Sequence, residues 1–217
     1  MKKLVLAGCA VLISSAVAYG ASTDGPYMGV KAGMAMPKDS DVTDSRFPAG
    51  LTADMSYSHG PVASLAAGYK SGPMRFEGEL EYQKTGSDQV NVSANGFSVG
   101  LPLSGDVTAT SLFLNFYYDF VNSSKLTPYL TAGVGRTWLK VDDFSITIPG
   151  VGTFNDSGSY SDNVFAYQVG AGIGYAVTDS ITLDLSYRYF ETQKADFDGT
   201  EAKLSSHNLL IGGRFGF

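Results

Sequence analysis

The chain contains 217 residues, including 26 Gly, 13 Tyr and 13 Phe, and has a formal net charge of −6. So many aromatic residues exclude a disordered chain, and the negative charge argues against nucleic-acid binding. Only 17% of the residues are charged, and the abundance of Tyr, Phe and Gly favours strands and turns over helices.

Residues 1–20 have the features of a cleaved signal peptide. A pair of lysines precedes the apolar run LVLAGCAVLI (4–13), and the small residues AVA (16–18) suit cleavage. The apolar run is too short for a membrane-spanning helix. The segment LAGC also matches a lipoprotein signal, which is an alternative. Because Cys9 is the only cysteine, cleavage near residue 20 leaves a chain without disulfides.

After this segment, apolar residues alternate with small or polar ones in eight stretches, a period typical of β-strands. In chain order, the predicted strands are 26–36, 61–70, 73–83, 111–120, 128–141, 164–177, 180–190 and 208–217. Their lengths, about 10–14 residues, suit tilted strands that cross a bilayer. One face of these strands is apolar with aromatic residues near its ends, and the other face is small, polar or charged.

Short and long connectors alternate between these strands. The short ones are 71–73, 121–127 and 178–180, and the long ones are 37–60, 84–108, 142–163 and 191–203. This alternation is typical of outer-membrane barrels, which have short periplasmic turns and long surface loops. We therefore predict that residues 21–217 form an all-β domain, an eight-stranded antiparallel transmembrane β-barrel. It would lie in the outer membrane of a Gram-negative bacterium with its loops extracellular and both termini periplasmic.

A soluble antiparallel barrel or sandwich would show the same alternation, with its apolar face inward. Four features favour the membrane barrel: the signal peptide, the alternating connectors, the aromatic strand ends and the C-terminal phenylalanine. The lumen of an eight-stranded barrel has room only for side chains. We therefore expect the bulky aromatic face to point outward and the small, polar face to point inward.

Two parts of the sequence resemble known proteins. The segment SHNLLIGGRFGF (206–217) resembles the C-terminal assembly signal of Gram-negative outer-membrane proteins. The segments TPYLTAGVGRTW (127–138) and FAYQVGAGIGYAVTDSITLDLSYRYF (165–190) resemble the opacity-protein and surface-antigen family, which is akin to OmpA and OmpX-type eight-stranded barrels. The resemblance says nothing about the loops, because loop sequences vary in such families. It implies recognition by the barrel assembly machinery through Leu209, Ile211, Phe215 and Phe217.

The alternation of inward and outward positions along each strand assigns ten charged residues to the lumen. They are Lys31, Lys70, Arg75, Glu77, Glu79, Glu81, Asp119, Asp184, Arg188 and Arg214. Five are cations and five are anions, a balance expected in a narrow lumen because unpaired buried charges are unfavourable. One interpretation is a static, salt-bridged core. The other, which the resemblance to OmpA-type barrels permits, is a gate in which Arg188 exchanges among the three glutamates.

Arg136 falls in the outward phase of its strand, near the expected outer interface. With Trp138 and Lys140 it forms a predicted aromatic and basic belt that faces outer-membrane lipid headgroups or lipopolysaccharide phosphates. A local bulge that turns Arg136 inward is the alternative.

Catalysis and metal binding have little support in the sequence. His59 and His207 are the only histidines, and no acid partner is identified for a site formed by His207 and Ser205. The segment ADFDGTE (195–201) lacks the full spacing of a calcium loop. We therefore predict no enzyme activity, no metal site and no cofactor.

Two functions follow from a barrel of this kind. In the first, the barrel anchors long loops with a structural or adhesive role toward a host surface ligand. In the second, the protein is a small porin that passes small solutes through a gated polar lumen. The loops are acidic, which keeps them soluble; loose binding of divalent cations or a basic host partner are alternatives. They carry no motif that names a ligand.

Overall fold

The computed structural model describes residues 24–44, 51–94, 97–148, 152–197 and 200–217, so the predicted signal peptide lies outside the described residues. The regular elements are strands: β1 (Gly25–Pro37), β2 (Ser40–Asp44), β3 (Leu51–Tyr57), β4 (Gly60–Ser71), β5 (Met74–Ala94), β6 (Phe97–Asp119), β7 (Leu126–Ile148), β8 (Gly152–Ala176), β9 (Ile181–Thr192), β10 (Ala195–Phe197), β11 (Thr200–Ala202) and β12 (Ser205–Gly216). Within these ranges, no helix has the length and apolar character needed to cross a membrane.

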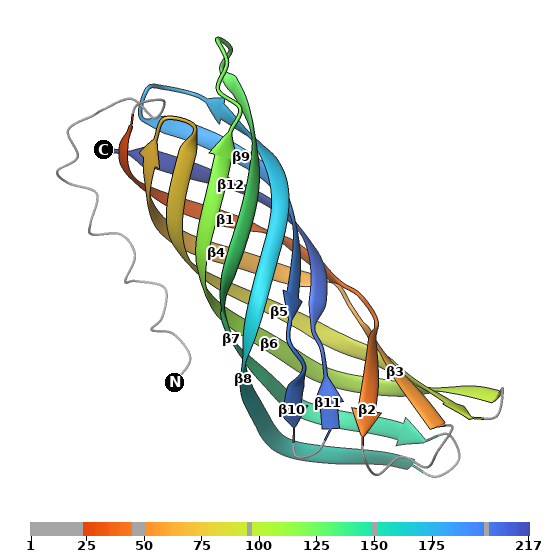
Figure 1. Cartoon of the computed structure of the whole chain (residues 1–217). Helices are drawn as coiled ribbons and strands as arrows, with labels where there is room; N and C mark the ends of the chain where they lie inside the picture. The colour runs from red at the N-terminus through yellow and green to blue at the C-terminus, as the bar shows by residue number, and fades with distance from the viewer. Residues whose placement is uncertain (1–23, 45–50, 95–96, 149–151, 198–199) are drawn as a thin grey trace, which may run out of the picture.

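Eight of the strands close into a tilted antiparallel barrel (Figure 1). The order around the wall is β1, β4, β5, β6, β7, β8, β9 and β12, each strand paired with the next. The pairing of β1 with β12, from Tyr27 opposite Gly216 to Pro37 opposite Ser206, closes the ring. The prediction of an eight-stranded antiparallel barrel is confirmed.

The strands are longer than predicted, because two of the expected loops are mostly hairpins. β5, β6, β7 and β8 contain 21, 23, 23 and 25 residues. β3 pairs with the far half of β5, β2 pairs with β3, and β11 pairs with β2, so the wall continues beyond β1, β4 and β12. The sequence QVNVSANGFSV (89–99) carries the signal that was missed, since alternating residues around an Asn-Gly pair are typical of a hairpin.

The two ends of the barrel differ. The short turns and the C-terminus gather at one end, and the extended hairpins gather at the other (Figure 1). We call these the turn end and the hairpin end. At the turn end, Gly72 has a φ of +57°, a conformation that strains other residues. Asp24 accepts a hydrogen bond of 2.7 Å from the Gly72 amide, which ties the start of the described chain to this turn.

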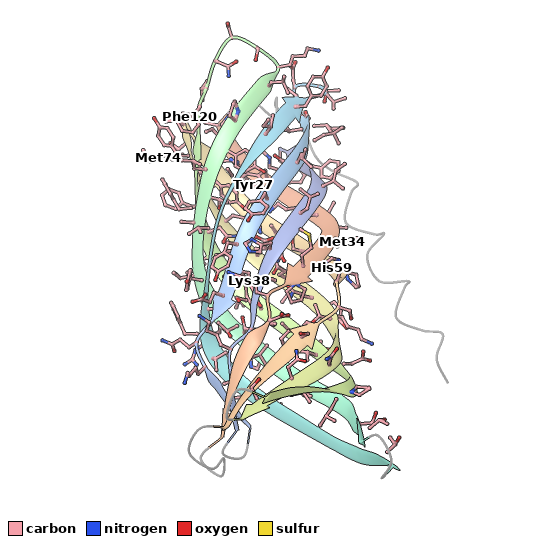
Figure 2. All side chains as sticks on the ribbon, turned by 90° about the vertical axis from the view of Figure 1, so that its right-hand side faces the viewer. Tyr27, Met34, Lys38, His59, Met74 and Phe120 are labelled. Carbon is pink, nitrogen blue, oxygen red and sulfur yellow. The ribbon has the colours of Figure 1, made fainter. Side chains whose placement is uncertain are left out.

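The outer face of the barrel is an apolar band. Its large apolar side chains are between 37% (Tyr167) and 72% (Leu114) exposed. Met74 and Phe120 point away from the wall in Figure 2. Along β8 the outward apolar positions run from Phe165 to Tyr175. Ten steps of about 3.3 Å at a tilt of about 40° rise about 25 Å, the height of the apolar band on outer-membrane barrels.

Candidate functional site

Nine of the ten charges assigned to the lumen are buried inside the barrel, and Lys70 is half-buried near the turn end. Near the same end, Arg75 holds Asp119 through Nε, at 3.0 Å from both carboxylate oxygens, and through Nη2, at 2.8 Å. Arg214 Nε donates to Asp184 Oδ2 at 2.6 Å. Each of these two arginines therefore has a carboxylate partner on a neighbouring strand.

The middle of the lumen holds two cations and three anions. Arg188 Nη1 donates to both carboxylate oxygens of Glu79, at 2.9 and 2.8 Å, and lies 3.8 Å from Glu81. Lys31 Nζ donates to Glu77 at 2.9 Å and lies 3.5 Å from Glu79. The main partner of Arg188 is therefore Glu79, and Glu79 is shared between the two cations.

Neutral side chains complete this charge network. Tyr27 and Tyr117 donate their hydroxyls to Glu77 at 3.0 and 2.7 Å. Asn115 donates to Glu79 at 2.5 Å and accepts a hydrogen bond of 2.8 Å from Gln168. These residues come from β1, β5, β6 and β8, so the network ties opposite walls of the barrel together.

Aromatic rings also lie inside the barrel, so the expectation of a lumen lined by small and polar side chains alone is wrong. The Arg75 guanidinium lies 4.2 Å from the ring centroid of Tyr117 and 4.9 Å from that of Tyr129. Glycine on a neighbouring strand provides the space, since a Cβ on Gly172 would lie 2.5 Å from the Tyr129 ring. The buried inward rings are those of Tyr27, Phe113, Tyr117, Tyr129 and Phe190.

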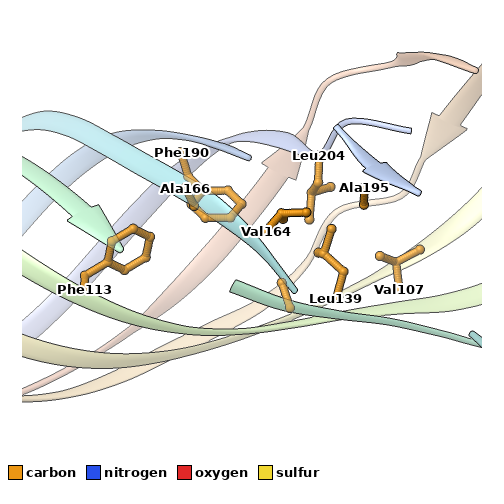
Figure 3. Packing of buried hydrophobic residues seen from close by; sticks show 9 residues of the cluster. Val107, Phe113, Leu139, Val164, Ala166, Phe190, Ala195 and Leu204 are labelled. Atoms are coloured by element: carbon orange, nitrogen blue, oxygen red, sulfur yellow. The ribbon is translucent and has the colours of Figure 1, made fainter. Parts of the chain in front are cut away.

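An apolar cluster lies inside the barrel (Figure 3), and it extends beyond the charge network toward the hairpin end, where Val107 lies opposite Thr85 in the register of β5 and β6. Phe113 and Phe190 meet edge to face, with ring centroids 6.0 Å apart. Phe113 lies directly opposite Glu79 in the register of β5 and β6, so the cluster adjoins the charge network. We call it the apolar plug; it consists of Val107, Ala109, Phe113, Leu139, Val164, Ala166, Phe190, Ala195 and Leu204.

Strand phase alone did not reveal this plug, although its members occupy inward positions. Val107 and Ala195 lie in segments expected to be loops, and Leu204 lies outside the predicted strands. Gly135 lies directly opposite Phe113 in the strand register, and a Cβ at this position would meet the Leu112 carbonyl at 2.1 Å and the Phe113 ring at 2.8 Å. Glycine opposite an inward aromatic residue therefore marks a filled lumen.

The charge network and the apolar plug close the lumen in series. An ion moving along the lumen would have to separate paired charges and then leave water entirely to pass the plug, and both steps are unfavourable. This arrangement favours a static core over a gate, and the small-porin alternative is less supported.

The predicted belt residues Arg136, Trp138 and Lys140 point outward from β7. Here β7 pairs in regular register with both neighbours, with Arg136 between Leu112 of β6 and Phe165 of β8. The bulge that would turn Arg136 inward is therefore not present at this position.

The C-terminal segment closes the barrel at the turn end. Leu209, Ile211 and Phe215 point outward from β12, with exposures of 48%, 65% and 42%. The Phe217 amide donates to the Pro26 carbonyl at 3.2 Å. Recognition of these residues by an assembly machinery remains a prediction.

The residues considered for catalysis are held in other contacts. His207 Nδ1 forms a hydrogen bond with the Tyr187 hydroxyl, and the two rings stack. Ser205 is buried, and the hydroxyl of its neighbour Ser206 lies within hydrogen-bond distance of Gln83 and Asn208. The acidic side chains of segment 195–201 lie outside those described. In the described ranges, no three His, Cys, Asp or Glu side chains are grouped to hold a metal ion.

Comparison with known proteins identifies the family to which this barrel belongs. Residues 5–215 match the family "Outer membrane protein beta-barrel domain". The chain is 34% identical over 154 residues to outer membrane protein PagN of Salmonella typhimurium, covering 65% of this chain and 62% of PagN. It is 34% identical over 135 residues to a Rickettsia conorii protein named "Putative adhesin RC1281", covering 56% and 51% of the two chains.

A solved structure shows the same fold. The crystal structure of Neisserial surface protein A aligns with 89% of this chain and 97% of its own, with a TM-score of 0.53 and 21% identity. The aligned part of the chain spans 62% and 51% of the length of these two curated relatives.

Proposed function

Because the chain belongs to the outer membrane protein β-barrel family and lies in the outer membrane of a Gram-negative bacterium, we propose that it is a surface-interaction protein. In this proposal the barrel is a closed anchor, and the hairpin end contacts a partner on another surface, such as a host cell. PagN and the Rickettsia protein, one of them named an adhesin, support this proposal.

The observation that carries the proposal is the contrast between the interior and the hairpin end. Inside, the charge network and the apolar plug close the lumen. Outside, β5 and β6 remain paired from Lys84 and Thr108 out to Ala94 and Phe97. Ten residue steps at a tilt of about 40° project about 25 Å beyond the apolar band. So much ordered structure outside the membrane suits recognition rather than transport.

The charge of the hairpin end indicates the kind of partner. The four segments predicted as long connectors (37–60, 84–108, 142–163 and 191–203) contain 14 acidic and 5 basic residues, a net charge of −9. Two-thirds of the 21 acidic residues therefore lie in these segments. A strongly negative surface attracts and orients a basic partner. We propose a partner surface rich in Lys and Arg.

Shortened hairpins test the proposal. Ser87 pairs with Gly105, and Asp142 pairs with Ser159, so each pair marks a place where the hairpin can be closed by an Asn-Gly turn. Cells that display the doubly shortened barrel should lose adhesion to host cells. The turn-end variant Lys125→Ala serves as a control and should adhere like the parent.

Two measurements decide between the functions. The shortened barrel must still show a heat-dependent mobility shift in electrophoresis, which establishes folding. Undiminished adhesion by this folded barrel would refute the surface proposal. In planar bilayers we expect no steady conductance; steady pores altered by Arg188→Ala or Glu79→Gln would instead support the porin.

A further inference from the structure

The outer face of the barrel contains a groove of about 380 Å³ in the apolar band, over β5 to β8. Its floor is Ala132 and Gly133 of β7, where the outward side chain is small. In the strand register Ala132 lies between Phe116 of β6 and Val169 of β8, whose larger side chains form the walls. The volume falls in the range of small-molecule sites, about 300–1,000 Å³.

The apolar band ends directly beyond this groove, toward the hairpin end. Arg136 is four residues after Ala132 on the same face of β7. In the next outward row, Trp138 lies between Thr110 and Asn163, so the neighbouring strands have become polar. Arg136 therefore lies at the level where lipid headgroups meet acyl chains.

Arg136 differs from the other arginines in the described part of the chain. Arg75, Arg188 and Arg214 each hold a buried carboxylate. Arg136 is exposed, and within the described ranges its only hydrogen bonds run from Nη1 to Asn163, at 3.4 Å to both the carbonyl and Oδ1. Its Nε and Nη2 donors remain available for the bidentate contact that guanidinium groups make with phosphate.

We propose that the groove and Arg136 together bind one phosphorylated lipid of the outer leaflet, with an acyl chain over Ala132 and a phosphate on Arg136. Charge complementarity selects this occupant, because the exposed Arg136 guanidinium contacts only the neutral Asn163 among the described residues. A chain with an uncharged headgroup would fill the groove but leave Arg136 without an anion. The inference is independent of the proposed surface function.

Trp138 provides a local reporter, since it is the only tryptophan of the chain and lies two residues from Arg136 on the same face. The barrel is refolded in phosphatidylcholine vesicles that contain phosphatidic acid brominated near the carboxyl end of its acyl chains. Bromine quenches tryptophan fluorescence on contact. We expect the phosphatidic acid to bind about fivefold more tightly than equally brominated phosphatidylcholine, the effect of one cationic residue near an anionic lipid. Unbrominated lipid A should displace it and restore fluorescence.

Paired variants separate the two parts of the site. Arg136→Ala should abolish the preference for phosphatidic acid, and Ala132→Leu should reduce binding by filling the groove while keeping the charge. Two controls should behave like the parent: Lys125→Ala makes the same charge change at the turn end, and Ala63→Leu makes the same size change on the outer face of β4.

The proposal is overturned by any of three results in barrels that keep their mobility shift. These are equal quenching by the two brominated lipids in the parent, a preference that survives Arg136→Ala, and binding that is unchanged by Ala132→Leu.

Discussion

Removal of the central cation tests whether the charge network is a static core. The side chains of Arg188 and Glu79 are both 0% exposed, and their contacts are 2.9 and 2.8 Å long. Deleting one partner of a buried ion pair leaves an uncompensated charge, which typically destabilises a protein by about 3–5 kcal/mol. Lys31 remains 3.5 Å from Glu79 and compensates in part. We therefore expect Arg188→Met, which keeps the volume, to lower the free energy of unfolding by about 3 kcal/mol.

The measurement is equilibrium unfolding in lipid vesicles, followed by Trp138 fluorescence. The double variant Arg188→Met/Glu79→Gln should recover most of the loss, because it removes both charges. Arg214→Ala is an internal comparison: this side chain is 9% exposed near the turn end, so water can replace the arginine and the loss should be smaller. A loss below about 1 kcal/mol for Arg188→Met would mean that the central pair is hydrated, and the argument for a static core would fail.

Three further predictions concern the plug, a glycine and a tyrosine. Phe113→Ala should lower the free energy of unfolding by about 3–5 kcal/mol yet add no conductance in planar bilayers, because the charge network still closes the lumen; steady pores would contradict this. Gly172→Ala should destabilise the barrel by about 1–3 kcal/mol, because its Cβ would lie 2.5 Å from a buried tyrosine ring. Gly29→Ala, another inward glycine whose nearest contact would be 3.8 Å, should have little effect in the same unfolding assay. Burial and a nearby aspartate raise the pKa of Tyr57 from 10.0 to about 12, so its neutral form stabilises the fold below pH 10 and this contribution is lost as the pH rises toward 12. Unfolding measured between pH 9 and 12 should therefore show a smaller decline for Tyr57→Phe than for the parent, and equal declines would refute the assignment.

The face that each strand residue occupies could be predicted from the sequence, because successive side chains of a strand point to opposite faces of the sheet. In β5, Glu77, Glu79 and Glu81 are buried in the lumen, while Leu80 and Tyr82 are about half exposed outside. A shift of one residue would exchange every side chain between lipid and lumen. Once the apolar face of a strand is assigned to the lipid, the other face is assigned to the lumen. This assignment was correct even for the charged residues of β5.

The partners across the lumen could not be predicted in the same way. Arg188 and Glu79 are 109 residues apart in the chain, and their contact depends on the stagger of strands around the closed barrel. Alternation says which face a side chain takes but not its height relative to the opposite wall. Thus the sequence indicated three possible glutamates for Arg188, and only the register of the intervening strands distinguishes Glu79 from Glu77.

The hairpins and the plug were missed for a related reason. The alternation of apolar residues predicts the end of a strand where the apolar face ends. Beyond the bilayer, however, the outer face of a strand meets water, so a strand can continue there without apolar residues. Val107 continues the inward phase beyond residue 111, where the predicted strand begins. The inward face is therefore the better guide to strand length outside the membrane.

The ionisable residues divide into compartments that match the proposed roles. The lumen holds five cations and five anions, the hairpin-end segments hold 14 acidic and 5 basic residues, and the outer belt adds Arg136 and Lys140. Balanced charge inside the barrel stabilises a closed core, because each buried ion requires a partner. The excess negative charge at the hairpin end does not stabilise the fold, since like charges repel one another. Water or a cationic partner relieves this repulsion, which supports the proposal that recognition takes place at the hairpin end.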